Sequence, residues 1–279
     1  MRIGRFEADG RVDLGVIVGD GIIALGFEFP DMLALIAGGG EALDAVRAEV
    51  AGRAADHALA DVRLLAPLRP GKYLAIGMNY ADHLAEMKHG EQPAHQYWFN
   101  KQTTCIAGPF DAIDPGVSEK VDYEVELGVV IGKVAKGVSA ADALDHVFGY
   151  LVANDVSARD WQRHTPTFTM GKSFDTHGPI GPWIVTADEV PDPQALALRS
   201  FVNGEKRQES DTARMIHTIA AQIEYLSTAF TLEPGDLIAT GTPAGVGAAM
   251  DPPTFLREGD VVRCEIDGIG AIENRVARG

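Results

Sequence analysis

Two glutamates lie two positions apart in a largely apolar segment at residues 121–131, VDYEVELGVVI. If this segment is a β-strand, Glu124 and Glu126 point to the same face, with Cα atoms about 6.6 Å apart. Two carboxylates placed in this way repel each other unless a cation lies between them. A strand with one solvated face is the alternative, but Val130 continues the glutamate face into an apolar run. We therefore expect the pair at the mouth of a buried region.

A third carboxylate follows the next apolar segment, residues 147–153. Asp155 either caps the N-terminus of a short helix or supplies a third oxygen ligand beside the glutamates. Hard divalent ions take oxygen ligands, and Mg²⁺ works with few carboxylates because it keeps several waters. Arg159 and Gln162, three residues apart on that helix, would then face the site together.

A lysine in the segment TMGKSFDTHGP, residues 169–179, is a candidate fixed cation. Its Gly-Lys-Ser triplet is not a phosphate-binding loop, because Pro166 stands where that motif requires a glycine. Lys172 lies in a stretch that contains glycine and proline and not on a charged helix face. It is therefore either an ordinary surface lysine or a cation near the carboxylates.

Two further segments carry groups suited to catalysis or binding. His83 and Glu86 are three residues apart in a predicted helix over residues 80–88. A carboxylate at that spacing orients the imidazole and makes it more basic, as a general base for water requires, although such pairs are also frequent on helix surfaces. Residues 234–247 predict a strand that enters a glycine-rich loop, which is either a tight turn or an anion pocket with the Thr242 hydroxyl as donor.

These candidates need a scaffold of many short strands. The pattern predicts a hairpin over residues 12–25, a helical segment over 31–50 broken at glycines 38–40, and one clear later helix over about 211–230. Strands are expected at residues 73–77, 121–131, 146–153, 179–186, 198–204, 236–240 and 260–267. So few helices among the strands disfavour a doubly wound sheet or a TIM barrel. The turn-rich segment 66–71 predicts a boundary between a small β-rich domain, 1–66, and a catalytic domain, 67–279.

The charge of the chain disfavours several classes of partner. Lys and Arg number 24 against 40 Asp and Glu, so the net charge is −16, which argues against nucleic acid and anionic membranes. Cys105 and Cys264 lie far apart without a C-x-x-C motif, which excludes a zinc ribbon or a redox dithiol. The chain has no apolar N-terminal segment and no run of about 18 apolar residues, so we expect a soluble cytoplasmic protein.

Five of these segments together resemble the fumarylacetoacetate hydrolase superfamily. They occur in the family's order between residues 71 and about 270: NYADH (79–83), the Glu124-x-Glu126 pair, NDVSARD (154–160), KSF (172–174) and TGTP (240–243). The resemblance implies a fold that is mainly β with α (α+β): a mixed β-roll, usually a homodimer, here with a small N-terminal domain. Residues 1–65 lack the larger N-terminal domain of fumarylacetoacetate hydrolase itself, which argues against that substrate.

The resemblance also implies roles for the candidate residues. Glu124, Glu126 and Asp155 would bind Mg²⁺ or Mn²⁺. A small anionic substrate would be held by four side chains: Lys172, Arg159, Gln162 and Thr242. His83 and Glu86 would form a water-activating dyad on a mobile lid.

The reaction expected from this resemblance is hydrolysis of the C3–C4 bond of a 2,4-dioxo acid to pyruvate and a carboxylic acid. Bacterial hydrolases of sugar-acid breakdown, which act on L-2,4-diketo-3-deoxyrhamnonate, are one similar group. Water activated by His83 with Glu86 would attack C4, and the metal and Lys172 would stabilise the departing pyruvate enolate. One alternative is a 2-oxo acid decarboxylase or keto–enol isomerase on the same metal site. The other is a non-catalytic ligand-binding protein, which would need no base.

Overall fold

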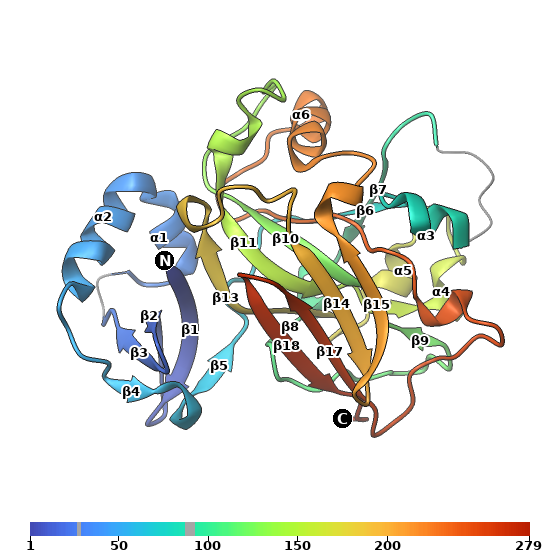
Figure 1. The fold of residues 1–279 in the computed structure, drawn as a ribbon, viewed down its shortest axis with the longest axis horizontal. Helices are drawn as coiled ribbons and strands as arrows, with labels where there is room; N and C mark the ends of the chain where they lie inside the picture. The colour runs from blue at the N-terminus through green and yellow to red at the C-terminus, as the bar shows by residue number, and fades with distance from the viewer. Residues whose placement is uncertain (27–28, 87–92) are drawn as a thin grey trace.

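A twelve-stranded sheet runs through the molecule, and a four-stranded sheet packs against its centre (Figure 1). The computed structural model describes residues 1–26, 29–86 and 93–279. The main path of the large sheet is, in spatial order, β4 (His57–Ala58), β3 (Gly21–Ala24), β2 (Arg11–Val18), β1 (Arg2–Ala8), β13 (Gly178–Thr186), β11 (Val147–Asn154), β10 (Val125–Ile131), β16 (Leu237–Ala239), β6 (Tyr73–Gly77) and β7 (Tyr97–Lys101). Two short strands complete it, β5 (Arg63–Leu65) beside β1 and β8 (Ile106–Ala107) beside β13.

The smaller sheets lie toward the C-terminal half of the chain. The four-stranded sheet has the order β15 (Glu205–Asp211), β14 (Ala197–Val202), β17 (Val261–Ile266) and β18 (Gly270–Arg275). A two-stranded sheet pairs β9 (Val121–Asp122) with β12 (Ser157–Ala158). This mixture of sheets with few helices confirms the predicted α+β class.

Strands β10 and β11 form the centre because their sequences, VELGVVI and VFGYLVAN, are apolar at nearly every position. Every residue of both strands is buried, as expected for strands covered on two faces. They pair antiparallel, from Val125 opposite Asn154 to Ile131 opposite Val147. This register brings the start of β10 beside the end of β11.

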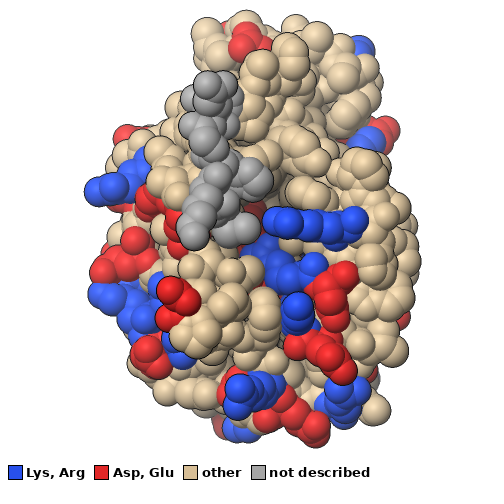
Figure 2. Space-filling model, turned by 90° about the vertical axis from the view of Figure 1, so that its right-hand side faces the viewer, with Lys and Arg blue, Asp and Glu red and all other residues tan. Residues whose placement is uncertain are grey.

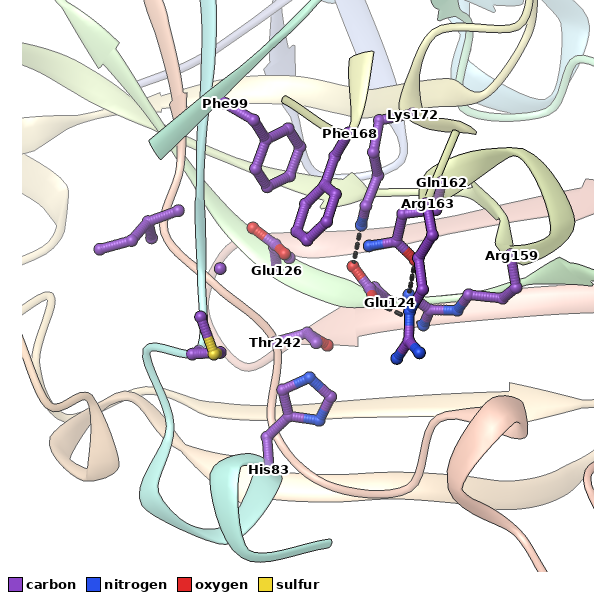
Figure 3. Close-up of a pocket in the computed structure, with 13 residues that line it drawn as sticks. His83, Phe99, Glu124, Glu126, Arg159, Gln162, Arg163, Phe168, Lys172 and Thr242 are labelled. Atoms are coloured by element: carbon purple, nitrogen blue, oxygen red, sulfur yellow. Dashed lines mark hydrogen bonds and ion pairs between the residues drawn. The ribbon is translucent and has the colours of Figure 1, made fainter. Parts of the chain in front are cut away.

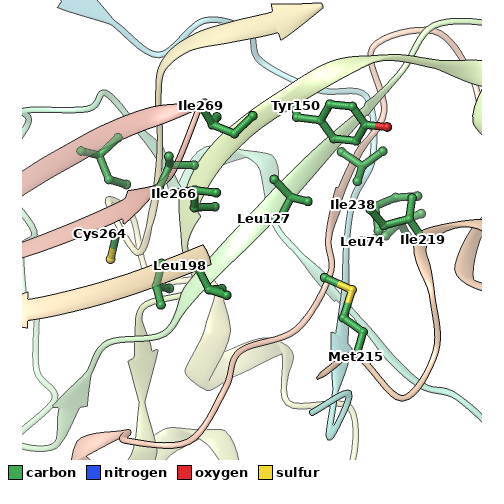
Figure 4. Packing of buried hydrophobic residues seen from close by; sticks show 14 of the residues in the cluster. Leu74, Leu127, Tyr150, Leu198, Met215, Ile219, Ile238, Cys264, Ile266 and Ile269 are labelled. Carbon is green, nitrogen blue, oxygen red and sulfur yellow. The ribbon is translucent and has the colours of Figure 1, made fainter. Parts of the chain in front are cut away.

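Alternate side chains of β10 pack in two different hydrophobic cores. Leu127 packs in the core shared with the four-stranded sheet, together with Leu198 and Ile266 (Figure 4). Val130 packs in the second core, which includes Leu35 of α1. Glu126 lies on the Val130 side because side chains alternate along a strand.

Helices among the described residues are few, and most are short: α1 (Met32–Ala37), α2 (Gly39–Val50), α3 (Ala81–Glu86), α4 (Arg159–Gln162), α5 (Thr169–Lys172) and α6 (Ile219–Ala229). The break predicted at glycines 38–40 is confirmed, because α2 begins at Gly39, whose φ of +60° suits glycine. The helix predicted over 80–88 is described only as far as Glu86, and the rest of it lies outside the described residues. No described helix is long and apolar enough to cross a membrane.

Two predicted elements need correction. Residues 121–131 are not one strand, because β9 ends at Asp122 and β10 begins only at Val125. Between them, the Glu124 N–H donates to the Asn154 side chain at 3.0 Å and not to the backbone of a neighbouring strand. The helix predicted over 211–230 begins only at Ile219, because Thr218 caps it by accepting a hydrogen bond from the Ala221 N–H. Eight of the described strands were not predicted at all: four long ones, β1, β7, β15 and β18, and four short ones, β4, β5, β8 and β12.

The domain boundary at residue 66 stays a prediction. Strand β1 pairs with β13 through Arg2 opposite Val185 and Ile3 opposite Ile184. The large sheet therefore continues from the N-terminal segment into the rest of the chain.

His177 is buried in the turn that leads into β13. Its ring stacks on Phe174 with 5.1 Å between centroids, and its Nε2 donates to the carbonyl of Asp114 at 3.0 Å. Burial, reinforced by the charge of Lys101, lowers the pKa of His177 to about 4.

His177 should make the stability of the protein fall at acid pH. Between pH 6.5 and about 4 the unfolded chain binds a proton at this imidazole that the folded chain does not bind, so stability is lost as pH falls through that window. We expect about 3 kcal/mol of the unfolding free energy to be lost through this group. Urea unfolding at pH 7 and pH 4 should show a smaller loss for His177→Phe than for the wild type. Equal losses would contradict the assignment.

Candidate active site

Three buried carboxylates meet beside the ends of the two central strands, and Figure 3 shows two of them, Glu124 and Glu126. Glu124 immediately precedes β10, Glu126 is the second residue of that strand, and Asp155 follows the last residue of β11. One ligand oxygen from each of the three lies within 4.8 Å of the others. The antiparallel register of β10 and β11 therefore builds the acidic triad that the sequence predicts.

Two cations balance Glu124, the partly exposed Arg159 and the buried Lys172. Arg159 donates from Nη2 to Glu124 Oε1 at 2.6 Å and from Nε to Asp122 Oδ2 at 2.9 Å. Lys172 donates to Glu124 Oε2 and to Asp155 Oδ2, both at 2.6 Å. Burial alone would raise the pKa of Glu124, but Lys172 and Arg159 outweigh it and hold the pKa well below its usual range.

Glu126 has no such cation among the described residues. Its carboxylate accepts a hydrogen bond from the Gly241 N–H at 2.8 Å. That approach needs glycine, because φ is +99° and a Cβ would lie 2.7 Å from Asn79 Cβ. Burial, together with the charges of Asp155 and Glu124, raises the pKa of Glu126 well above its ordinary value.

The triad fits a hard divalent ion. Its donor atoms are carboxylate oxygens, which Mg²⁺ and Mn²⁺ prefer over softer ligands. An ion at this position would also supply the positive charge that Glu126 lacks. The residues present are thus compatible with the expected metal.

The two short helices α4 and α5 hold the cations in place. They pack so closely that a Cβ at Gly171 would lie 2.3 Å from the Gln162 backbone. Arg159 donates from Nη1 to Gln162 Oε1 at 2.9 Å, so the expected shared orientation of these two side chains is confirmed. Asp155 is not a helix cap, since α4 begins at Arg159 with Ala158 in the cap position.

His83 lies on the opposite wall of the same pocket from Lys172 (Figure 3). His83 Nδ1 is 2.8 Å from Glu86 Oε1, and Glu86 Oε2 accepts a hydrogen bond from the Gly245 N–H at 2.9 Å. Glu86 is therefore held from two sides and fixes the orientation of the ring. With Nδ1 engaged, Nε2 is the nitrogen left for proton transfer.

Thr242 lines the pocket, but its hydroxyl is not the free donor that we predicted. The hydroxyl donates to the Val125 carbonyl at 2.9 Å and accepts from Gln208 Nε2 at 2.8 Å. A hydroxyl has a single proton, so this proton is already in use. In this structure Thr242 shapes the wall of the pocket and ties its loop to β10.

Sequence reasoning missed several residues of the site. Phe99 and Phe168 form an apolar wall, with ring centroids 6.0 Å apart, and Arg163 lines the pocket at its exposed mouth. Lys101 was also missed, although the two-residue period of residues 97–101 places it on the same face as Phe99. On this side of the molecule Lys and Arg side chains gather at a hollow (Figure 2).

Comparison with known proteins agrees with this geometry. The sequence profile described as "Fumarylacetoacetate (FAA) hydrolase C-terminal" matches residues 72–277. A Burkholderia ambifaria protein that carries the name "Putative hydrolase" is 53% identical over 205 residues, which are 72% of each chain.

Solved structures are similar over the whole chain. The fumarylacetoacetate hydrolase of Exiguobacterium antarcticum is 40% identical, with a TM-score of 0.89 and complete coverage of both chains. The maleylpyruvate hydrolase of Sphingobium sp. SYK-6, in complex with manganese(II) and pyruvate, is 34% identical with a TM-score of 0.83 and complete coverage of both chains. A 5-carboxymethyl-2-hydroxymuconate delta-isomerase of Mycobacterium smegmatis is 36% identical with a TM-score of 0.79, again with complete coverage. The profile match covers more than half of the chain, and the chain belongs to the fumarylacetoacetate hydrolase family.

Proposed function

We propose that this protein is a metal-dependent hydrolase that cleaves the C3–C4 bond of a 2,4-dioxo acid to pyruvate and a carboxylic acid. The proposal rests on the lining of one pocket. Two carboxylates of the acidic triad, the cations Lys172 and Arg159, and the imidazole of His83 line this pocket, and Glu86 contacts that imidazole. The similar Sphingobium hydrolase, with its manganese(II) and pyruvate, supports the same chemistry. The homodimer and the cytoplasmic location stay predictions.

In this proposal Glu124, Glu126 and Asp155 hold Mg²⁺ or Mn²⁺. The bound ion supplies Lewis-acid polarisation of the 2-oxo acid end of the substrate. Arg159 and Gln162, on the neighbouring wall, bind and orient that end of the substrate.

The protein's own residues move the proton and stabilise charge. His83 takes a proton from the water that attacks C4, while Glu86 keeps the imidazole oriented. The new C4–O bond forms as the C3–C4 bond breaks, and the proton lost by water balances the one that C3 gains. Burial would lower the pKa of Lys172, but Asp155 and Glu124 outweigh it and raise the pKa, so Lys172 is a cation that stabilises the enolate.

An isomerase is the second candidate, favoured by the similarity to the Mycobacterium smegmatis delta-isomerase. Such a reaction, like decarboxylation, needs the same stabilised enolate but no attack by water. The two candidates therefore differ in what they require of His83.

Removal of the metal should abolish activity. We expect EDTA treatment to stop pyruvate release, and added Mg²⁺ or Mn²⁺ to restore it. Glu126→Gln should lose Mn²⁺ binding in calorimetry yet stay folded, because the change removes a buried charge that has no cationic partner in the described chain. Full turnover by a rigorously metal-free preparation would exclude the mechanism.

Loss of the base should separate hydrolysis from isomerisation. His83→Ala should slow hydrolysis of a 2,4-dioxo acid about 10²–10⁴-fold, because general-base catalysis contributes about that factor. Affinity for Mn²⁺ and pyruvate should be nearly unchanged, since neither depends on the imidazole. Glu86→Gln, the matched control for ring orientation, should cost less. Cleavage by His83→Ala at the wild-type rate would favour the isomerase or decarboxylase.

A panel of 2,4-dioxo acids should identify the C4 substituent. Arg163 at the pocket mouth favours a substituent that ends in a carboxylate over a neutral acyl chain or a polyhydroxyl sugar chain. Pyruvate release should show the highest kcat/KM for the carboxylated member, and Arg163→Ala should lower that value about tenfold while sparing the neutral members. An equal loss for all members would assign Arg163 no part in specificity.

A further inference from the structure

Lys101 places a buried ammonium group against one of the candidate metal ligands. The residue ends β7, and its Nζ lies 2.5 Å from Asp155 Oδ1. The carbonyl oxygens of His177 and Val156 lie 3.0 Å and 3.4 Å from the same nitrogen. Because an ammonium group has three N–H donors, these three oxygens satisfy it completely and fix its position.

The two carboxylate oxygens of Asp155 consequently have different roles. Each oxygen contacts one lysine: Oδ1 contacts Lys101, and Oδ2 contacts Lys172, which also contacts Glu124 Oε2. Oδ2 is therefore the oxygen on the side of the triad. The Asp155 N–H also donates to the Glu124 carbonyl at 2.9 Å, so both backbone and side chain of this residue are held.

We propose that Lys101 is a positioning residue for the metal site, which holds Asp155 so that it offers the ion a single oxygen, Oδ2. The inference rests on the metal site proposed above. Groups that orient a metal-ligating side chain typically change metal affinity about 10–100-fold when they are removed. Without Lys101, the Oδ1 of a fully buried carboxylate would lose its charged partner, and among the described side chains only Lys172, at Oδ2, would still hold the carboxylate group.

Two other roles for Lys101 make different predictions. If Lys101 mainly repelled the ion through its positive charge, removing the charge would tighten metal binding. If it served only packing and charge balance in the fold, its loss would lower the melting temperature but leave the metal affinity of the folded protein unchanged. Metal affinity measured without substrate therefore distinguishes all three.

The chain offers a matched control. Lys72 also pairs with a buried aspartate, since its Nζ lies 2.8 Å from Oδ2 of Asp236, whose side chain is 2% exposed. Neither residue belongs to the triad or to the pocket that contains it. Lys72→Met thus shows how the loss of a lysine–aspartate pair that is remote from the metal site changes the stability of the protein.

The test is Mn²⁺ binding to the whole protein, measured from the electron paramagnetic resonance signal of free Mn²⁺ and from the Mn²⁺-induced shift in Tm. Lys101→Met should raise the Mn²⁺ Kd about 10–100-fold. Lys101→Gln, which keeps an N–H donor without the charge, should raise it by a smaller factor. Lys72→Met should lower Tm but leave the Kd unchanged.

An unchanged or tighter Kd in Lys101→Met would overturn the proposal. If that variant does not fold, Lys101→Gln decides, and unchanged or tighter Mn²⁺ binding in it would have the same consequence. A wild-type protein that binds no Mn²⁺ would instead overturn the metal site of the proposed function.

Discussion

Three carboxylates buried within 4.8 Å of one another repel each other unless positive charge lies close to them, and much of the site consists of groups that supply this charge. An ionised carboxylate removed from water costs several kcal/mol unless a cation or several donors compensate it. Lys172 and Arg159 compensate Glu124, and Lys101 with Lys172 compensates Asp155. Glu126 receives only a backbone N–H among the described contacts, and this imbalance is the strongest structural argument for a bound ion.

The glycine-rich loop after β16 connects the two halves of the site. At one end the Gly241 N–H contacts Glu126, a candidate metal ligand, and at the other the Gly245 N–H contacts Glu86, the partner of His83. Between them the Thr242 hydroxyl bonds the Val125 carbonyl of β10. The same short loop thus connects the two sides of the site, and it helps to set the separation between the proposed base, His83, and the acidic triad.

The pocket contains several cations although the chain as a whole is strongly acidic. The protein carries a net charge of −16, which repels small organic acids at long range. Within the pocket, Arg159, Arg163 and Lys172 line the walls. At physiological ionic strength, screening limits the range of this repulsion to about one Debye length. A small anion at the mouth of the pocket is therefore affected mainly by the nearby cations.

Local sequence patterns were sufficient to predict the central strands and several short-range contacts of the site. Apolar runs predicted the central strands, alternation predicted that Glu126 shares a face with Val130, and the spacings of His83 with Glu86 and of Arg159 with Gln162 predicted contacts that the structure contains. The strand 205–211 was hidden because its residues, EKRQESD, are polar, although the Asn-Gly turn before it is a hairpin signal.

Only the tertiary structure decided which charges meet. Lys101 contacts Asp155, which is 54 positions away in the sequence. The Thr242 hydroxyl donates its hydrogen bond to the carbonyl of Val125, which is 117 positions away. Periodicity reports which face of an element a side chain occupies, but the partner of a buried charge is set by the packing of remote elements. The sequence by itself therefore predicted the candidate metal ligands and the candidate base, while the fold decided how each of these side chains is held.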